Sequence, residues 1–456
     1  MSTQTPFSRI VFSLLIALLF SLPARAQDPA ARFDEYLGDL ARKDLFSGAV
    51  LVARDGKVLF AKGYGKANEE FDIPNAPAVK FRLGSITKQF TAAAILQLEE
   101  RGKLRVADPI CNYLKECPET WKEITIRHLL THTSGIPNYT ALPSYPQSMH
   151  APVTNDGMIA RFKDRPLDFK PSEKWNYSNS GYFLLGVIIE KVSGEGYEAY
   201  LQKNIFTPLG MKDSGYDWHH TILKNRATGY SYQKGARVNS TYLDMGQPAA
   251  AGSLYSTVED LFRWNEALFN GKALSPKSFE AMTTPVLNNY GYGVGMTEVF
   301  KRKTVSHGGG INGFNTYLIR YLDDKVTIAV LRNRDYGAPS PTKICETLAA
   351  LYFGEKIETP AAAPAPATVK VDPKIYNEYA GEYQLAPTFV ISITREGDRL
   401  MAQATGQPQI ELFPESETKF FLKVVEAKVT FVRGADGKVT HLILHQGGDQ
   451  QAKKVK

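Results

Sequence analysis

Segments with the composition of β-strands lie at both ends of the larger part of this chain, and helices and loops lie between them. Near its start, Gly48–Ala53 and Lys57–Tyr64 are joined through Asp55-Gly56, a dipeptide typical of a tight hairpin turn. Near its end, residues 317–321 and 326–331 are short runs rich in β-branched and aromatic residues. We therefore predict an α/β fold of the α+β kind, with an antiparallel sheet built from both ends beside a helical cluster.

Periodicity and capping signals place the helices of this region. The stripe formed by Phe90, Ala94 and Leu98 recurs every four residues and predicts one buried helix face. The predicted helices are residues 31–42, a helix that opens at Ser85 and ends before Gly102, residues 181–189, a helix after a capping box at Ser256–Glu259, and residues 344–352.

The texture of the chain changes after a Pro/Ala-rich stretch, which predicts a semi-stiff linker over residues 356–372. Beyond it, short strand-like runs alternate with turn signals, a pattern that favours a small antiparallel barrel or sandwich at residues 373–450. The predicted strands are residues 389–394, 400–404, 410–413, 419–423, 428–433 and 439–445. The larger part before the linker is placed at residues 30–355.

The first residues have the pattern of a secretory signal. Arg9 precedes an apolar run at residues 10–22, and Ala24-Arg25-Ala26 gives an A-x-A cleavage site. We expect removal of residues 1–26, with a periplasmic or secreted mature protein and no membrane span after cleavage. The alternative is an uncleaved N-terminal anchor, although the apolar run is short for a membrane span.

The formal net charge of +7 and the pI of about 9.0 do not by themselves indicate a nucleic-acid partner. The basic clusters are Lys301-Arg302-Lys303 and Lys453-Lys454, and neither has a pattern of stacking aromatics around it. We interpret the charge as solvated surface, with mild affinity for an anionic substrate as the alternative. The oligomeric state is left open.

Cysteine and histidine usage bears on disulfides and metals. Cys111 and Cys117 are six residues apart, and in an exported chain they are either bridged or free. Cys345 lies in an apolar helical stretch and is expected to be a buried thiol. His128 and His132 have the spacing of a metal pair, but no third ligand accompanies them, so structural hydrogen bonding is the favoured interpretation. No metal or organic cofactor is predicted.

A hydroxyl and an amine stand three residues apart in Ser85-Ile86-Thr87-Lys88. Residues at i and i+3 are neighbours on a helix face, so Lys88 can take the Ser85 proton and leave a nucleophile. A four-residue S-x-x-K recurs by chance, and its weight depends on a second base and an oxyanion hole elsewhere in the chain.

Tyr177-Ser178-Asn179 supplies a candidate second base. A tyrosine has a pKa near 10, but a neighbouring ammonium favours its phenolate, which could accept the Ser85 proton and later activate water. Asn179 offers an amide that can orient Lys88 and hold a substrate carbonyl. The competing interpretation of this tripeptide is a surface turn.

The segment His307-Gly308-Gly309-Gly310 precedes a predicted strand. Glycines at a strand edge let a substrate approach the backbone closely, and backbone N–H groups there can face an oxyanion. The N–H of Ser85, at a helix start, is the natural partner donor. We expect His307 at the mouth of the site, facing substrate. A flexible loop is the competing interpretation.

Taken in order, Ser85-x-x-Lys88, Tyr177-x-Asn179 and His307-x-Gly309 resemble the three active-site motifs of serine β-lactamase-like hydrolases of the class C type. Class C β-lactamases, D-alanyl-D-alanine carboxypeptidases, D-aminopeptidases and related esterases make up that family. Residues 126–136 and 292–296 also look like this family. The resemblance covers about residues 30–355.

The resemblance implies roles for these residues. Ser85 is the nucleophile that forms an acyl-enzyme, Lys88 and Tyr177 transfer protons, and Asn179 positions substrate. The N–H groups of Ser85 and Gly310 form the oxyanion hole. His307 stands where the family has a lysine in its K-T-G form, and a histidine is mostly neutral at pH 7. That departure weakens the case for β-lactamase activity and is compatible with an esterase or peptidase.

The sequence therefore predicts an exported serine hydrolase that cleaves an amide or ester in a small-molecule or peptide substrate, with Gly309 and Gly310 lining the site. Ester, β-lactam and D-amino-acid peptide substrates stay open. A penicillin-binding or sensor module that acylates with little turnover is the alternative, as is a scaffold whose partner surface is the C-terminal domain.

Overall fold

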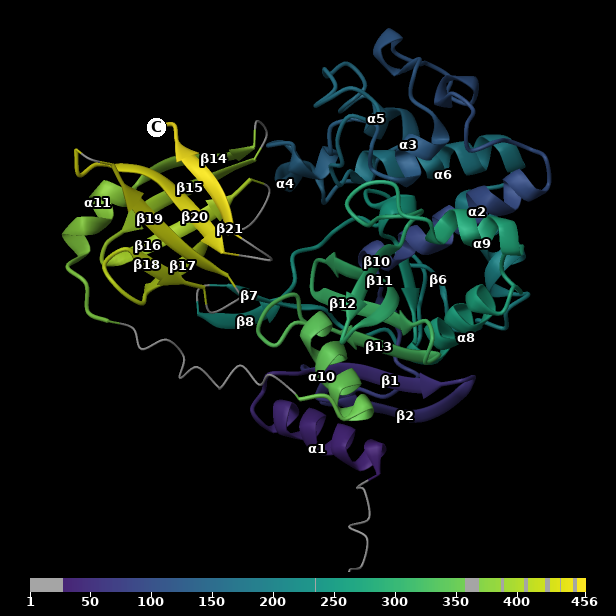
Figure 1. The fold of residues 1–456 in the computed structure, drawn as a ribbon, viewed down its shortest axis with the longest axis horizontal. Helices are drawn as coiled ribbons and strands as arrows, with labels where there is room; N and C mark the ends of the chain where they lie inside the picture. The colour runs from purple at the N-terminus through teal and green to yellow at the C-terminus, as the bar shows by residue number, and fades with distance from the viewer. Residues whose placement is uncertain are drawn as a thin grey trace, which may run out of the picture.

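The computed structural model describes residues 28–233, 235–356, 369–386, 389–405, 409–422, 427–434, 436–445 and 449–456. The predicted signal segment and most of the predicted linker lie outside these residues. Within the described part, six antiparallel strands form the main sheet, in the order β10-β11-β12-β13-β1-β2 (Figure 1). Their bounds are β1 Gly48–Arg54, β2 Lys57–Tyr64, β10 Gly295–Val299, β11 Arg302–Ile311, β12 Phe314–Tyr321 and β13 Val326–Arg332.

The two ends of the sheet-forming sequence meet at β1 and β13, which pair antiparallel with Val50 opposite Val330. Both strands are buried, because each face of the sheet is covered. Alternate residues of β1 face opposite sides, so Leu51 joins the core of the helical cluster, whereas Val52 packs toward α1 (Pro29–Arg42) and α10 (Pro341–Phe353). This confirms the prediction of one sheet built from both ends of the region.

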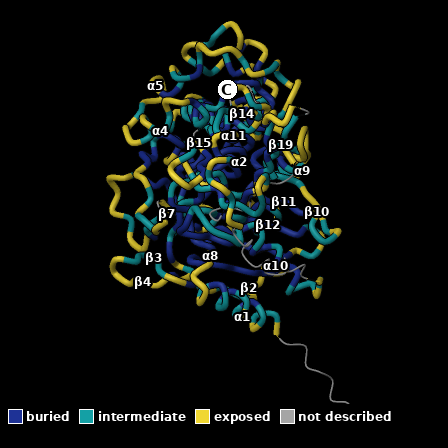
Figure 2. Tube along the Cα trace, turned by 90° about the vertical axis from the view of Figure 1, so that its left-hand side faces the viewer, coloured by how far each residue is buried: buried dark blue, intermediate teal, exposed yellow. Residues whose placement is uncertain are grey.

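The helical cluster on the other face is organised around α2 (Thr87–Glu100), in which every residue up to Leu98 is buried. Figure 2 shows these buried segments inside the molecule and the exposed ones around its edge. The other helices of this part are α3 Ile126–Leu130, α4 Tyr145–Ser148, α5 Asn155–Ile159, α6 Asn179–Ser193, α7 Tyr197–Leu201, α8 Val258–Phe269 and α9 Pro276–Thr283. Short strands accompany them: β3 Lys66–Asn68, β4 Ile73–Pro74, β5 Phe81–Arg82, β6 Gly215–Tyr216, β7 Tyr230–Gln233, β8 Ala236–Asn239 and β9 Leu254–Ser256.

The C-terminal part is a closed antiparallel barrel, formed by eight strands of the described residues after a short helix α11 (Tyr376–Tyr379). The strands are β14 Gly381–Ala386, β15 Phe389–Glu396, β16 Arg399–Ala404, β17 Ile410–Pro414, β18 Lys419–Phe421, β19 Lys428–Arg433, β20 Val439–His445 and β21 Asp449–Lys454. Pairing of β14 with β21 closes the barrel, and Tyr379 stacks on Phe431 inside it with ring centroids 4.1 Å apart.

Most predicted elements are confirmed, with local differences. The capping residue of α8 is Thr257, whose side chain accepts the Asp260 N–H, and the predicted cap at Ser256 is wrong by one residue. The hydroxyl of Ser256 instead bonds the buried Ser214 hydroxyl at 2.7 Å. The first and last barrel strands were not predicted.

Cysteine chemistry left open by the sequence is answered by the structure. Cys111 and Cys117 form a disulfide, which fastens the short segment between α2 and α3. Cys345 is a buried free thiol in α10, as expected.

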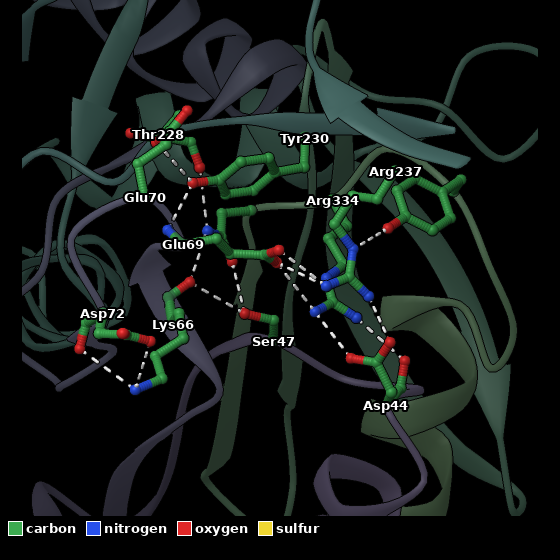
Figure 3. Close-up of polar contacts among 12 residues, drawn as sticks. Asp44, Ser47, Lys66, Glu69, Glu70, Asp72, Thr228, Tyr230, Arg237 and Arg334 are labelled. Atoms are coloured by element: carbon green, nitrogen blue, oxygen red, sulfur yellow. Dashed lines mark hydrogen bonds and ion pairs between the residues drawn. The ribbon is translucent and has the colours of Figure 1, made fainter. Parts of the chain in front are cut away.

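An ionic cluster fastens the β7–β8 hairpin to the end of the main sheet (Figure 3). Arg334 follows β13 and is nearly fully buried, and its guanidinium reaches Asp44 at 2.9 Å and Glu69 at 3.2 Å. Arg237 of β8 joins the same two carboxylates, at 2.8 Å from Glu69. The buried Arg334 and the partly exposed Arg237 therefore both have carboxylate partners, which offsets the free-energy cost of desolvating the guanidinium groups.

Candidate active site

Ser85 lies in the short 3₁₀ turn Gly84–Ile86 that leads into α2, and its position depends on close backbone packing. Gly84 has a φ of +55°, which favours glycine, and a Cβ there would come within 3.0 Å of the Gly310 N atom. The backbone of β11 therefore passes directly beside the turn that carries Ser85. A side chain at position 84 would push the two apart.

Lys88 is fully buried and points back to Ser85. Its Nζ lies 3.1 Å from the Ser85 Oγ, 2.8 Å from the Asn179 Oδ1 and 2.8 Å from the Ala251 carbonyl oxygen. These three acceptors satisfy the three donors of an ammonium. Burial holds the pKa of Lys88 well below its ordinary value, so a neutral amine that can accept the Ser85 proton is accessible.

Tyr177 lies against Lys88, whose Nζ is 4.7 Å from the centre of the phenol ring. The buried Tyr177 hydroxyl has no hydrogen-bond partner among the described residues. Burial raises the pKa of Tyr177, and the nearby Ser85 hydroxyl opposes that rise. The phenol is thus neutral in the free protein, which differs from the sequence-based expectation that an ammonium would favour the phenolate. Burial disfavours the charged form of both Lys88 and Tyr177.

Asn179 is the first residue of α6 and connects Lys88 to the segment that contains Asn138 and Thr140. Its Oδ1 accepts the Lys88 hydrogen bond, its Nδ2 donates to the Thr140 Oγ1 at 3.2 Å, and its backbone N–H donates to the Asn138 Oδ1 at 3.1 Å. The amide orientation is therefore set from both sides, with its oxygen toward the amine.

The glycine run lies on β11, at a bare strand edge. Among the described residues, β10 pairs with β11 only as far as Ser306, so the glycines pair with β12 alone. A Cβ at Gly309 would clash with the Leu83 carbonyl oxygen, at a distance of 1.9 Å. The same oxygen accepts a hydrogen bond from the Thr316 hydroxyl at 2.8 Å. Glycine is required there for β11 to approach the Ser85 turn. The backbone of Gly310 then faces that turn, where its N–H could meet an oxyanion beside the N–H of Ser85.

His307 precedes the glycines and is 9% exposed. Its Nε2 lies 2.9 Å from the Tyr290 hydroxyl and its Nδ1 lies 2.6 Å from the Gly308 carbonyl oxygen, so both ring nitrogens bond protein groups. Because a carbonyl only accepts, Nδ1 carries the proton and Nε2 accepts from Tyr290. Burial, with the Lys88 charge, lowers the pKa of His307 to about 4, so the ring is neutral at pH 7.

Sequence reasoning missed Tyr290 altogether, and it missed the contacts that the His132 ring makes in this site. The His132 ring lies 4.3 Å from the Tyr177 ring and 4.8 Å from the Tyr290 ring, centre to centre. For His132 the sequence favoured structural hydrogen bonding over a metal pair with His128, and its Nδ1 does accept the Ser178 N–H, but its contacts with these two rings were not predicted. The sequence position of His132, just after a helix and three residues before Gly135, was a usable signal, because a turn there can direct a side chain back into the core.

His128 has a capping role. Its Nδ1 accepts the Thr125 N–H at the start of α3, and its Nε2 lies 2.8 Å from the Ser172 Oγ. In the described residues, no group of three or more His, Cys, Asp or Glu side chains is placed to hold a metal ion.

Comparison with known proteins assigns this arrangement to a family. The family model described as Beta-lactamase matches residues 31–350, and a model for a domain of unknown function, DUF3471, matches residues 365–454. This chain belongs to the Beta-lactamase family. The mixed helix and sheet part is accordingly a β-lactamase fold, and the barrel corresponds to the second model.

Relatives within the Beta-lactamase family cover much of the chain. Penicillin-binding protein 4* of Bacillus subtilis (strain 168) is 33% identical over 91% of this chain and 97% of its own length. Teichoic acid D-alanine hydrolase of Staphylococcus aureus (strain MRSA252) is 30% identical over 58% of this chain and 63% of its own length. The structure of an octameric penicillin-binding protein homologue from Pyrococcus abyssi superposes with a TM-score of 0.66 at 27% identity, covering 93% of this chain and 99% of that one.

Membership of this Beta-lactamase family makes the chain a serine hydrolase in class. Ser85 and Lys88 come from one stretch of sequence and Tyr177 and Asn179 from another, and the structure brings the two stretches together. No helix in the described ranges is both long and apolar enough to cross a membrane.

Proposed function

We propose that this protein is an exported serine hydrolase that cleaves an ester or amide through an acyl-enzyme on Ser85. The observation that carries the proposal is the buried Lys88 amine, 3.1 Å from the Ser85 Oγ, with its pKa lowered by burial. A neutral amine at this distance is a suitable general base, and general-base assistance is worth about 10²–10⁴-fold in rate.

The proposed reaction has two halves. Ser85 Oγ attacks the substrate carbonyl carbon while its proton moves to the Lys88 amine, and the resulting oxyanion accepts hydrogen bonds from the N–H groups of Ser85 and Gly310. The carbonyl re-forms, and the leaving group departs as an alcohol or amine after receiving a proton through the neutral Tyr177 hydroxyl, which Lys88 replenishes. Water then attacks the acyl-enzyme by the reverse proton path, releasing the acid and regenerating Ser85.

Within this scheme the Tyr177 hydroxyl is a suitable relay because, apart from the neighbouring Ser85 hydroxyl, no group of the described residues holds it in a hydrogen bond. Asn179 holds the Lys88 amine, and its contact with the substrate carbonyl is part of the proposal. Gly309 and Gly310 are proposed to line the acyl site, and Gly309 does so by permitting the approach of β11.

The charge of the site bears on the substrate. His307 is neutral at pH 7, because burial lowers its pKa to about 4. A substrate carboxylate beside the scissile bond would find no fixed cation at position 307. We therefore favour an ester or amide without an adjacent carboxylate over a D-alanyl-D-alanine peptide.

Intact-protein mass spectrometry after exposure to acyl donors tests the proposal. The panel contains p-nitrophenyl esters, nitrocefin and a D-alanyl-D-alanine peptide. We expect a mass increase that appears and decays with the esters, and none with Ser85→Ala. The matched control is Ser193→Ala, at the end of α6 opposite Asn179 and about 21 Å away along the helix. Labelling that persists in Ser85→Ala would contradict the nucleophile assignment.

A second candidate is a penicillin-binding or sensor module that acylates with little turnover. It is favoured by the relative from Bacillus subtilis, which is named a penicillin-binding protein and aligns over most of this chain. One equivalent of product from nitrocefin, followed by a stable adduct and no steady state, would support this candidate over the hydrolase. Sustained ester turnover would exclude it.

Export is part of the proposal and rests on the signal-like pattern of residues 1–26. Fusing these residues to a reporter enzyme that is active only outside the cytoplasm tests it. Reporter activity that requires the apolar run at residues 10–22 is expected, and cytoplasmic retention would contradict export.

A further inference from the structure

His132 holds both sides of the Tyr177 backbone. Its main-chain carbonyl accepts the N–H of Asn176 at 3.0 Å, and its ring Nδ1 accepts the N–H of Ser178 at 3.2 Å. These two amides belong to the residues immediately before and after Tyr177. One residue therefore anchors the segment twice.

The backbone of His132 is adapted to this double contact. Its φ is +59°, in the left-handed region, which places its carbonyl and its ring against the same segment. The side chain is 1% exposed. Because Nδ1 accepts a backbone N–H, the ring is the neutral tautomer with its proton on Nε2. Burial lowers the pKa of His132, in agreement with that neutral state.

The His132 ring also packs directly on the phenol of Tyr177, with 4.3 Å between ring centres. Neighbouring tyrosines are fixed by their own hydroxyls: Tyr182 donates to the Leu130 carbonyl oxygen at 2.8 Å, and Tyr290 bonds His307. The Tyr177 hydroxyl has no such anchor in the described residues. The direction of its phenol is therefore set by ring packing and by the two backbone bonds.

We propose that His132 is a positioning residue for Tyr177, which aims the phenol at Ser85 through two backbone hydrogen bonds and ring contact while leaving its hydroxyl free. The inference rests on the proposed function of Tyr177 as the proton relay. A misplacement of about 1 Å at a reacting group can cost about 10²-fold in rate, so such an anchor has a measurable kinetic consequence.

Two substitutions separate the parts of the anchor. His132→Asn keeps a side-chain acceptor near the Nδ1 position, and asparagine tolerates a positive φ. His132→Gly also tolerates that φ but removes both the acceptor and the ring. We expect kcat for p-nitrophenyl ester hydrolysis to fall about 10²-fold in His132→Gly, and about tenfold or less in His132→Asn, with KM changing little.

A double-mutant cycle with Tyr177→Phe distinguishes positioning from general structural support. If His132 acts through the Tyr177 hydroxyl, His132→Gly costs less than about threefold in kcat when Phe stands at position 177. The full 10²-fold loss in that background would overturn the proposal. His128→Ala, four residues earlier on the same segment, is the control, and it should alter stability without altering kcat.

Hydrogen exchange measured by mass spectrometry gives a readout independent of catalysis. Amides of Asn176 and Ser178 should exchange at least tenfold faster in His132→Gly than in the unsubstituted protein, with His132→Asn intermediate. Unchanged protection would overturn the anchor. If Ser85→Ala retained acyl labelling, the proposed function would fail while the exchange result would still decide the anchor.

Discussion

The lowered pKa of Lys88 can be tested through the free energy of unfolding, without a substrate. In the folded protein the amine is buried, and its pKa lies below the ordinary value of 10.5. Between these two pKa values the unfolded state binds more protons than the folded state. The stability contribution of Lys88 therefore rises with pH through this window and is lost as pH falls. One pKa unit corresponds to about 1.4 kcal/mol.

Lys88→Met removes the titrating group and keeps the volume. The substitution leaves the Asn179 Oδ1 and the Ala251 carbonyl oxygen without their donor, at a cost of about 1–3 kcal/mol each. That cost does not depend on pH, so it cancels when two pH values are compared. Between pH 7 and pH 9, the unfolding free energy of the unsubstituted protein should rise relative to Lys88→Met, at most by about 2.7 kcal/mol.

Urea unfolding of both proteins at the two pH values, followed by tryptophan fluorescence, measures this difference. Lys325→Met, an exposed lysine, is the control and should show no pH-dependent difference. A constant gap between the unsubstituted protein and Lys88→Met would mean that Lys88 stays charged in the folded state, and the neutral-base argument would be wrong.

Further predictions concern four other positions. Tyr177→Phe should cut ester turnover about 10²-fold or more. It should change the unfolding free energy by less than about 0.5 kcal/mol, because the buried hydroxyl has no hydrogen-bond partner among the described residues that would lose its bond; unchanged turnover would count against the relay. Gly309→Ala should slow acylation at least tenfold, because its Cβ would lie 1.9 Å from a carbonyl oxygen, whereas Gly295→Ala, with its nearest contact at 3.6 Å, should not. His307→Gln should lessen the loss of stability on acidification between pH 6.5 and pH 4. In that range His307 is protonated in the unfolded state but neutral in the folded state, because burial lowers its pKa to about 4. Identical pH profiles by thermal denaturation would contradict this. Arg334→Met should lower stability by about 1–3 kcal/mol through the carboxylates it leaves behind, and a melting temperature equal to that of the unsubstituted protein would refute it.

Local signals predicted much of the fold. Asp55 and Gly56 both have positive φ values in the turn between β1 and β2, the conformation that this dipeptide favours. The runs at β1 and β13 were predicted as strands of one sheet, and the structure buries both, which explains why they lack polar alternation. The last barrel strand escaped prediction because Asp449–Lys454 is polar, with only Ala452 buried, and its pairing with β20 and β14 is a backbone property.

The sequence predicted which residues form the site better than it predicted their protonation states. The spacing of Ser85 and Lys88 follows from helix geometry, so their contact could be inferred from sequence. The neutral state of Tyr177 could not, because it depends on desolvation by residues distant in the chain. His307 was expected to face substrate, but its two ring nitrogens bond the Tyr290 hydroxyl and the Gly308 carbonyl oxygen of its own strand, and no short-range pattern encodes that pairing. Its substrate role stays a prediction.

The most direct test of the central claim is to locate the acyl group. The protein is mixed with a p-nitrophenyl ester, quenched in acid within the first turnover, digested and mapped by tandem mass spectrometry. The account predicts that the added acyl mass lies on the peptide containing Ser85, at that residue. An adduct on any other side chain, or product formation with no adduct at any quench time, would contradict it.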